Sequence, residues 1–415
     1  GDIPDGRCCS CHLIILRTTC ETDPGSSPPE RAVTFLPSLD AESVALLRDL
    51  CGPHGIHASR SSTANYRAVF ARDAVMAGVA GLLLRDEVIT AGLVRTLEHL
   101  RQLQGPEGQV ASNFEMRDAG PHVSFGTLAP RIDAATWYLV GIGLAARAGA
   151  LDPADYRDSV RRAVHCLNAL EYNGRHLMYI PTGGNWADEY IYDGYILYDQ
   201  VLRAWALRLL GATYGEPAWL DKSQRIADTI SERFFASDKT GPQRPIAAFT
   251  PVHRHEMFDL AACALLAVSG IAPQRAQQAL AWIDQAFLQQ GALPPVFHPV
   301  IEEGDAEWPA LRRYHLHAFR NLPYEYHNGG IWPIWLGWLA LGQVQTGHHE
   351  QLPRLRREVL RALGAAPSFE FEEYLHGRTG AAGGTPHMAY TATGLLFLHL
   401  AGSDAPRELL APSFP

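Results

Sequence analysis

Apolar residues recur at the three- and four-residue spacing of amphipathic helices along most of the chain, and Gly, Pro or Asn ends each run. This periodicity predicts a nearly all-helical protein with almost no strands. The predicted helices span residues 41–51, 72–84, 86–103, 132–148, 154–170, 195–210, 217–235, 256–269, 273–290, 332–346, 350–363 and 387–401.

These predicted helices are of two alternating kinds. Those that begin near residues 72, 132, 195, 256, 332 and 387 are apolar on most sides, whereas those between them carry more charge. A helix that is apolar all round is a buried one. Six such pairs predict an all-α (α/α)6 toroid, with inner helices ringed by outer ones. We expect one folded domain over residues 38–403, a poorly ordered leader with Cys and Pro residues (1–37) and a tail (404–415).

Long loops precede the same apolar helices. Within a compact domain, long loops are usually functional. Because all six lead into inner helices, we expect them to gather at one end of the ring. The loops span residues 65–72, 108–131, 179–194, 243–255, 293–330 and 369–386.

Composition and charge exclude several kinds of partner. A net charge of −9 argues against a nucleic acid, and no apolar run reaches the length needed to span a bilayer. The seven cysteines lack the spacing of a disulfide framework, which favours a reducing cytoplasm. Cys8, Cys9 and Cys11 are too crowded for a typical zinc site, and no nucleotide-binding glycine motif is present, so we expect neither metal nor cofactor. The oligomeric state is left open, a homo-oligomer included.

Residues 181–200, PTGGNWADEYIYDGYILYDQ, have the composition of a sugar site. A Gly-Gly loop leads to Asn185, Trp186 and Asp188, and a long helix follows Gly194. Flat aromatic faces stack on sugar rings, and a carboxyl group transfers protons. The alternative is a polar helix N-terminus in which a carboxylate offsets unpaired backbone amides.

Four segments resemble the alkaline/neutral invertases, glycoside hydrolase family 100. ANYRAVFARDAVMAGVAGLLL (64–84) is similar to the NYDQxFxRDF opening of that family, and PRIDAATWYLVGIG (130–143) to its GRVxxxDxxLWW helix. YHNGGIWPIWLGWLALG (326–342) resembles SYHNGGSWP, and EEYLHGRTG (372–380) resembles PEYYDGKxG. The order and spacing agree over about residues 64–401. NWAD (185–188) is closer to the acid loop of amylo-1,6-glucosidase-like α-glucosidases.

The resemblance implies an (α/α)6 glycosidase that works with inversion. It assigns the general base to Glu373 and the general acid to Asp188, with Glu325 as a spare carboxyl for the base. In an inverting enzyme these groups lie about 6.5–9.5 Å apart, one protonating the leaving oxygen and the other activating water. Without the resemblance, Asp188 is equally a helix cap, and Glu373, beside Glu370 and Glu372, a solvated charge.

The remaining candidates would bind the sugar. Arg72 and Asp73 either bind hydroxyls or form a structural salt bridge. Asp133 and Trp137, one helical turn apart, either bind and stack or serve as a cap and a core residue. A further set surrounds Gly329 and Gly330, where backbone approaches a ligand closely. It comprises Tyr326, His327, Asn328 and Trp332. Trp332 alternatively packs in the core. Trp186 is the last predicted binding residue.

We therefore expect a glycoside hydrolase that cleaves a small α-linked glucoside with inversion, with sucrose as the leading single alternative substrate. Trp186, Tyr190 and Tyr192 stand where the invertases have a basic Arg-Arg pair, which favours stacking of the aglycone. Two other functions remain open on the same fold. A sugar epimerase or isomerase would rely on histidines such as His255 and His327, and a carbohydrate-binding protein without catalysis would tolerate the loss of Asp188 or Glu373.

Overall fold

The structure is a computed structural model that describes residues 31–61, 65–236, 241–366 and 368–411. Most of the predicted leader lies outside these residues. Helix α1 spans Arg31–Asp49, so it begins ten residues before the predicted start at Ala41 and includes residues that we assigned to the leader. The helix continues through Pro37, the last residue of the predicted leader.

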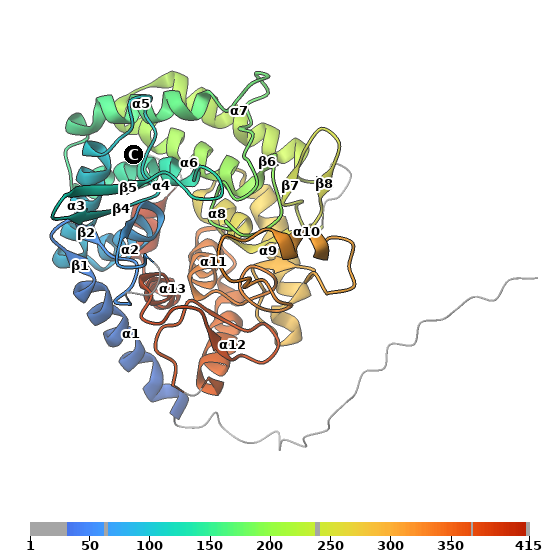
Figure 1. Cartoon of the computed structure of the whole chain (residues 1–415). Helices are drawn as coiled ribbons and strands as arrows, with labels where there is room; N and C mark the ends of the chain where they lie inside the picture. Colours follow the sequence, from blue (N-terminus) through green and yellow to red (C-terminus); the bar gives the residue numbers. More distant parts are fainter. Residues whose placement is uncertain (1–30, 62–64, 237–240, 367, 412–415) are drawn as a thin grey trace, which may run out of the picture.

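Six helices are buried along almost their whole length. They begin within four residues of the predicted inner helices, which confirms that set. Ala, Leu, Val and Trp dominate them, and α8 is buried at all ten positions. Helix α2 contacts α4, α4 contacts α6, α6 contacts α8, α8 contacts α11, α11 contacts α13, and α13 contacts α2 (Figure 1). The six are α2 (Ala71–Leu84), α4 (Asp133–Arg147), α6 (Leu197–Tyr214), α8 (Leu260–Ser269), α11 (Pro333–Gln345) and α13 (Ala389–Leu400).

The other long helices bury one face against this set. In α3, Ile89, Leu93, Leu97 and Leu100 are buried at helical spacing and contact α2, while the charged positions between them face solvent. Helix α1 likewise contacts α13, α5 contacts α4, α7 contacts α6, α9 contacts α8, and α12 contacts α11. Their bounds are α3 (Glu87–Gln102), α5 (Arg157–Asn168), α7 (Pro217–Arg233), α9 (Pro273–Ala286) and α12 (Leu352–Ala365).

Six backbone hydrogen bonds link the N-terminal ends of the inner helices in a cycle. At the start of each inner helix, one amide donates to a carbonyl of the loop that precedes the next inner helix. The bonds are 2.7–3.0 Å long and run Ala71 to Ser112, Ile132 to Gly184, Leu197 to Ala247, Leu260 to Val296, Ile331 to Leu375, and Ala389 to Ala58. They satisfy amides that a helix leaves unpaired at its start. They also hold the six long loops together at one end, as we expected.

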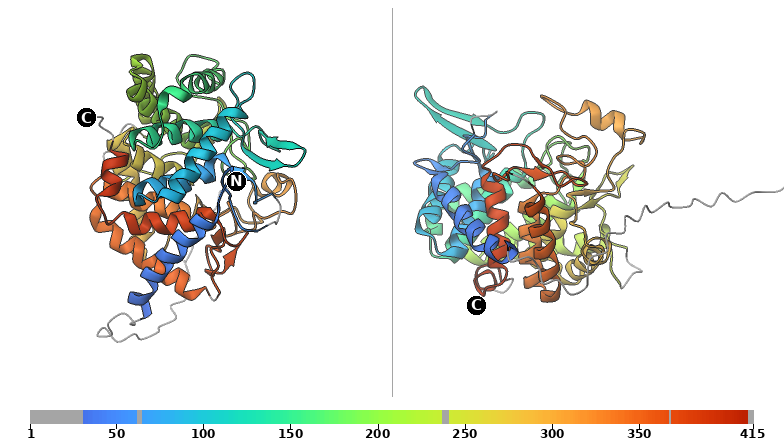
Figure 2. Two further views of the ribbon diagram at one scale, coloured as in Figure 1. Left: turned by 90° about the vertical axis from the view of Figure 1, so that its left-hand side faces the viewer. Right: turned by 90° about the horizontal axis from the view of Figure 1, so that it is seen from below.

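Short strands shape this end. β3 (Val69–Phe70), β4 (Asn113–Arg117) and β5 (Gly120–Ser124) form a three-stranded antiparallel sheet, and the right-hand view of Figure 2 shows the β4–β5 hairpin projecting from the same end as α10 (Trp308–Arg313). The other pairs are β1 (Cys51–Gly52) with β2 (Gly55–Ile56), β6 (Tyr195–Ile196) with β7 (Ala248–Phe249), β7 with β8 (Arg254–His255), β9 (Phe258–Asp259) with β10 (Phe297–His298), and β11 (Tyr374–Leu375) with β12 (Ala382–Gly383).

The predicted tail is partly helical. Helix α14 spans Ala405–Leu410, buries Pro406, Leu409 and Leu410, and contacts α2, α4 and α11. Within the described part of the chain, no helix combines the length and the apolar character needed to cross a membrane.

Candidate active site

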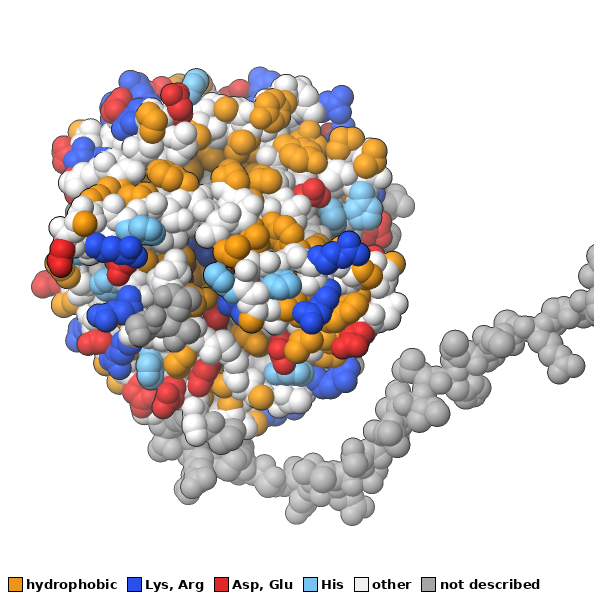
Figure 3. Space-filling view, viewed as in Figure 1, with side chains coloured by type: hydrophobic (Ala, Val, Ile, Leu, Met, Phe, Trp, Pro, Cys, Tyr) orange, Lys and Arg blue, Asp and Glu red, His pale blue; other side chains and the backbone are white. Residues whose placement is uncertain are grey.

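A cavity of about 470 Å³ opens at the loop end of the inner helices. Figure 3 shows this face, which is hollowed near its centre. Its walls come from the segments before α2, α4, α6, α11 and α13, so residues far apart in sequence meet there. They include Tyr66, Arg72, Asp73, Ser112, Asn113, Thr127, Arg131, Trp186, Asp188, Glu189, Leu316, His317, Arg320, Tyr326, Trp332, Glu373 and Tyr390.

Glu373 lies in this cavity and is 4% exposed. Its Oε1 accepts a 2.8 Å hydrogen bond from the Tyr66 hydroxyl, and its Oε2 accepts a longer one from the Thr385 amide. Burial raises the pKa of Glu373, and Arg320 opposes that shift. Glu325, the spare carboxyl, is not among the residues that line the cavity. The cavity therefore favours Glu373 over Glu325.

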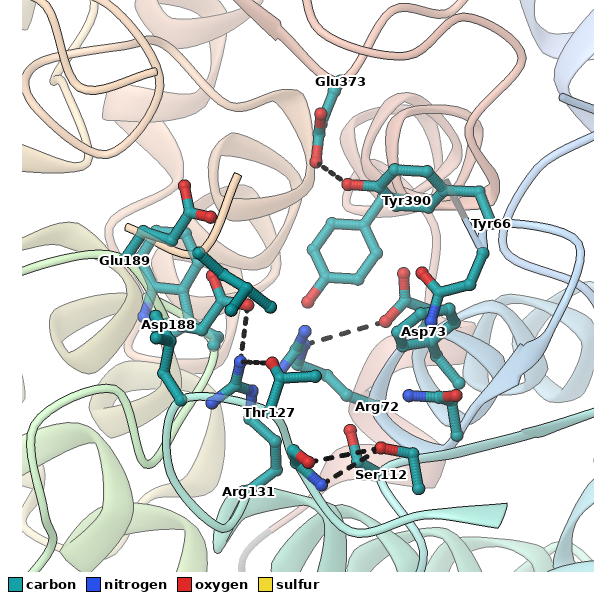
Figure 4. Close-up of a pocket in the computed structure, with 18 of the residues that line it drawn as sticks. Tyr66, Arg72, Asp73, Ser112, Thr127, Arg131, Asp188, Glu189, Glu373 and Tyr390 are labelled. Carbon is teal, nitrogen blue, oxygen red and sulfur yellow. Dashed lines mark hydrogen bonds and ion pairs between the residues drawn. The ribbon is translucent and has the colours of Figure 1, made fainter. Parts of the chain in front are cut away.

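Asp188 reaches the same cavity from the loop before α6, and its side chain is 31% exposed. Arg131 pairs with it at 2.7 Å and also donates to the carbonyl of Gly183 in the same loop. Figure 4 shows the carboxyl groups of Asp188 and Glu373 pointing toward the same space from different loops. The separation expected for an inverting pair stays a prediction.

Glu189 is a further acidic residue on the cavity wall and was not among the predicted site residues. It is 5% exposed and accepts a 3.2 Å hydrogen bond from Arg320, while its backbone carbonyl accepts from Asn321. The segment that carries Arg320 and Asn321 is thereby fixed against the loop that carries Asp188. Tyr314 adds a third contact, because its hydroxyl donates to the carbonyl of Thr182 at 2.6 Å.

Arg72 and Asp73 both line the cavity. Arg72 donates to Asp133 at 2.8 Å and lies 3.7 Å from Asp73. Asp73 Oδ2 is buried without a hydrogen-bond partner. Burial raises the pKa of Asp73 to about 7, with Arg72 opposing it. A carboxylate beside an arginine at a cavity wall is suited to binding sugar hydroxyls.

Trp186, Tyr326 and Trp332 also line the cavity. The three rings pack together, with Trp186 5.6 Å and Tyr326 5.3 Å from Trp332. Trp332 donates to the backbone carbonyl of Tyr326 at 2.9 Å, which fixes its indole. Trp332 thus has both roles that the sequence left open, a packed core residue and a wall of the cavity.

Four predicted binding residues lie behind the cavity wall and do not line it. Asp133 is fully buried, where it accepts from Arg72 and from Tyr198, and Trp137 packs on Trp205 and Trp338. Trp137 is a core residue, as its alternative reading had it, whereas Asp133 is the first residue of α4 and pairs with Arg72 and Tyr198 instead of capping the helix. The other two residues behind the wall are His327 and Asn328.

The Asn328 side chain binds the backbone of Ile301. Its Oδ1 accepts a hydrogen bond from the Ile301 amide and its Nδ2 donates one to the Ile301 carbonyl, both 2.8 Å long. His327 is 1% exposed, and both ring nitrogens lack a partner. Burial holds its pKa well below the usual value, so the ring is neutral. It stacks on Trp332 at 5.5 Å and supports that ring from behind.

The expected stacking by Tyr190 and Tyr192 is wrong. These side chains are 0% and 1% exposed, and both pack on Phe297. The two tyrosine rings and the Phe297 ring pack on one another in the core instead of facing the cavity. Of the three aromatic residues assigned to the aglycone, Trp186 alone lines the cavity.

Several residues of the cavity besides Glu189 were missed, among them Tyr66, Arg131, Arg320 and Tyr390. Tyr66 and Arg131 stand inside the quoted motifs ANYRAVF and PRIDAATW, so the motifs themselves were a usable signal. Arg320 and Tyr390 carry no such signal. Tyr390 is 4% exposed and lies near Arg72, whose guanidinium carbon is 5.9 Å from its ring centre.

His255 and His327, the histidines on which an epimerase would rely, do not meet in the cavity. His255 contacts Asp193 at 3.2 Å, and neither His255 nor His327 lines the cavity. Among the described residues, no cluster of His, Cys, Asp and Glu is arranged to hold a metal ion.

Solved structures share this fold. A glycosidase, determined as a glutamate-to-alanine variant in complex with glucose, matches with a TM-score of 0.63 at 15% identity over 91% of this chain and 99% of its own. A family 63 mannosylglycerate hydrolase from Thermus thermophilus, in complex with glucose, matches with a TM-score of 0.60 at 13% identity over 86% and 99%. A bacterial glucoamylase complexed with acarbose matches with a TM-score of 0.63 at 13% identity, over 90% of this chain and 56% of its own. No protein-family model and no curated sequence matches the chain.

Proposed function

We propose that the protein is an inverting glycoside hydrolase that removes one sugar from a small α-linked glucoside. The observation that carries the proposal is the meeting of Asp188 and Glu373, from loops before α6 and α13, in one cavity of about 470 Å³. That volume suits a small saccharide. The fold shared with three glycosidases supports it further. We also propose that the cycle of inner helices is an (α/α)6 toroid of the kind found in the invertase-like enzymes.

In the proposed reaction, Glu373 acts as general base and Asp188 as general acid. Water attacks the anomeric carbon and passes its proton to Glu373, while the bond from that carbon to the leaving oxygen breaks and Asp188 protonates that oxygen. Tyr66 fixes one oxygen of Glu373, which leaves the carboxylate oriented toward the cavity. Asp188 must carry a proton to act, so in the productive complex the glycosidic oxygen replaces Arg131 as its partner.

The sugar at the cleaved subsite is held by Arg72, Asp73 and the three packed rings of Trp186, Tyr326 and Trp332. Asp73 and Arg72 line the cavity and supply an acceptor carboxylate and donor groups for hydroxyls. The aromatic rings supply an apolar wall for a pyranose face. All of these residues except Trp186 come from the segments that most resemble the invertases, so we propose a glucose-like pyranose.

The aglycone is proposed to differ from the fructose of sucrose. The part of the wall formed by Ser112, Asn113 and Thr127, and by the segment 316–320, falls outside the four family-like motifs. A small polar aglycone is the match to these groups, and glycerate, named in one structural relative, belongs in the comparison.

The test is kcat/KM for sucrose against trehalose, kojibiose, isomaltose, maltose, glucosylglycerate and mannosylglycerate. We expect another substrate of this set to be cleaved at least as well as sucrose. A preference for sucrose above about a hundredfold, equivalent to ~2.7 kcal/mol in transition-state binding, would contradict the substrate proposal but not the hydrolase itself. A purely sugar-binding protein would release no sugar from any of them.

A further inference from the structure

Tyr390 brings a buried hydroxyl group to the cavity from the second position of α13. The residue is 4% exposed, and its hydroxyl makes no hydrogen bond of ordinary geometry to any described residue. In Figure 4 the Tyr390 ring lies between Glu373 and Arg72, and its hydroxyl points into the cavity. Buried polar groups of folded proteins are nearly always paired. A buried hydroxyl that faces a cavity in this way indicates a partner that enters the cavity.

The position of the Tyr390 ring is fixed by its neighbours. Trp332 and Trp335 meet it edge-on, with ring centres 6.5 and 6.4 Å away. The next residue along α13, Thr391, donates from its hydroxyl to the backbone carbonyl of Glu372 at 2.6 Å. That bond ties the start of α13 to the loop that carries the proposed base. The Tyr390 hydroxyl therefore has a set place relative to the base, as a group that contacts the substrate requires.

The groups beside Tyr390 indicate the chemistry of the partner. The guanidinium carbon of Arg72 lies 5.9 Å from the centre of the Tyr390 ring, and Arg72 Nε lies 3.7 Å from Asp73. The guanidinium only donates hydrogen bonds, an ionised carboxylate only accepts them, and a phenol hydroxyl does both. Burial raises the pKa of Tyr390 well above its usual value, so the hydroxyl keeps its proton. A neutral hydroxyl compound, whose own groups donate and accept, matches this combination.

We propose that Tyr390 is a substrate-binding residue whose hydroxyl hydrogen-bonds one hydroxyl of the sugar in the cleaved subsite and thereby selects sugars that carry it. This inference rests on the proposed function, because it takes the cavity to hold a glucose-like sugar. It deepens that function with a residue outside the four family-like segments, to which the resemblance assigns no role.

Stability is the first test, because a hydroxyl that serves the fold and one that serves the substrate differ in it. Tyr390→Phe removes a buried hydroxyl that lacks an ordinary hydrogen bond, so we expect an unchanged or higher Tm. Tyr198→Phe is the matched control. Tyr198 is also fully buried and packs on Trp335, but its hydroxyl accepts from Trp137 at 2.8 Å and donates to Asp133 at 3.1 Å. This control should lower Tm, and an equal drop in Tyr390→Phe would assign its hydroxyl to the fold and overturn the inference.

The second test combines Tyr390→Phe with substrates that each lack one sugar hydroxyl. With α-glucosyl fluoride, we expect Tyr390→Phe to lower kcat/KM by about tenfold, the worth of one neutral hydrogen bond. One monodeoxy analogue should lose at least as much with the wild type but little more with Tyr390→Phe, because the bond is already absent. For Tyr198→Phe the losses should multiply on every analogue. Multiplied losses for Tyr390→Phe as well would mean that its hydroxyl contacts no sugar hydroxyl.

Glucose binding separates this inference from the proposed function. Isothermal titration calorimetry of glucose and its monodeoxy forms repeats the comparison without any hydrolysis, and we expect the same loss of sensitivity to one hydroxyl in Tyr390→Phe. A wild type that hydrolyses glucosides without this coupling would overturn the role of Tyr390 alone. Coupled glucose binding by a wild type that hydrolyses nothing would contradict the proposed hydrolase and support Tyr390. A wild type that neither binds nor hydrolyses any of these sugars would overturn both.

Discussion

Tyr66 donates a 2.8 Å hydrogen bond to Glu373 across 307 residues of sequence. Tyr66 lies in the loop before α2 and Glu373 in the loop before α13, the first and last of the inner helices. The bond forms because α13 contacts α2 and the Ala389 amide donates to the carbonyl of Ala58. Closing the cycle of helices thus completes the site of the proposed base.

Replacing Tyr66 by Phe should lower kcat more than it raises KM. The hydroxyl orients Glu373 without being needed for the fold, so we expect kcat to fall by roughly ten- to a hundredfold, the range of a positioned proton-transfer group. Steady-state kinetics on the best disaccharide measures both constants. Tyr324→Phe is the control, because Tyr324 makes a similar 3.0 Å bond to Glu302 outside the cavity. Equal losses in the two variants would mean that the Tyr66 bond has no special role.

Asp188→Asn and Glu373→Gln should differ in their response to the leaving group. Fluoride leaves without protonation, so Asp188→Asn should hydrolyse α-glucosyl fluoride within about tenfold of the wild type while losing at least about a thousandfold on a disaccharide. Glu373→Gln should lose activity on both, because water still requires a base. Rates from fluoride release and sugar release measure the two effects. The opposite pattern would exchange the two assignments, and a full loss in Asp188→Asn with fluoride would remove its role as acid.

Gly384→Ala should damage the site more than Gly380→Ala does. Both glycines have positive φ, +82° and +72°, so alanine strains the backbone at either position. A Cβ on Gly384 would lie 2.6 Å from the Glu373 side chain, whereas one on Gly380 meets open space. We expect similar shifts in Tm but a further loss in kcat/KM, of roughly tenfold or more, for Gly384→Ala alone. Equal activities after correction for stability would contradict a tightly held Glu373.

Asp259→Asn should stabilise the protein at neutral and higher pH. Burial raises the pKa of Asp259 to about 7, and its Oδ2 has no partner. Between the unfolded pKa near 4 and the folded value, the native state holds the extra proton, so wild-type stability falls as pH rises through this window. Asparagine does not titrate and still caps α8. Urea unfolding should give an advantage on the order of 2–4 kcal/mol above pH 7 that disappears near pH 4.

Asp86→Asn should change the stability at neutral pH in the opposite direction. Asp86 caps α3, pairs with Arg48 at 2.7 Å, and its pKa is lowered by backbone hydrogen bonds and by Arg48 despite partial burial. The Asp86 carboxylate stabilises the fold above its pKa in the unfolded state, and this stabilisation is lost as the pH falls through its lower pKa in the folded state. This variant should be less stable than the wild type at pH 7 and equal to it at low pH. If both variants changed stability in the same direction at pH 7, the assigned environments would be wrong.

The helices that are buried on all sides were the feature most easily predicted from the sequence. The ten residues of α8 contain no charged residue, whereas α3 alternates buried leucines with charged positions, so the two kinds of helix are distinguishable without a structure. The β4–β5 hairpin was missed because Pro121 argues against a strand. The structure accommodates Pro121 because β5 is at the edge of its sheet, where the missing amide leaves no partner unpaired.

Only part of the candidate site could be predicted from the sequence. Asp188 and Glu373 were found through short motifs, but their meeting depends on the closure of the helix cycle, which no local pattern encodes. Arg320 lies 131 residues from its partner Glu189, so no spacing rule connects them. Tyr190 and Tyr192 were assigned wrongly because aromatic residues near a candidate acid have the same composition whether they face a cavity or the core. Asp133 and Trp137 illustrate the same limit, since a residue one turn into a helix reaches either the cavity or the layer behind it.

The stereochemistry of the first product is the most direct test of the proposed mechanism. Proton NMR during the first minutes of hydrolysis of the preferred α-glucoside resolves the two anomers before they equilibrate. We expect β-glucose to appear first with the wild type, and no sugar release with Glu373→Gln. Initial release of α-glucose would contradict the assignment of Asp188 and Glu373 as an inverting acid and base, and wild-type activity in Glu373→Gln would exclude Glu373 as the base.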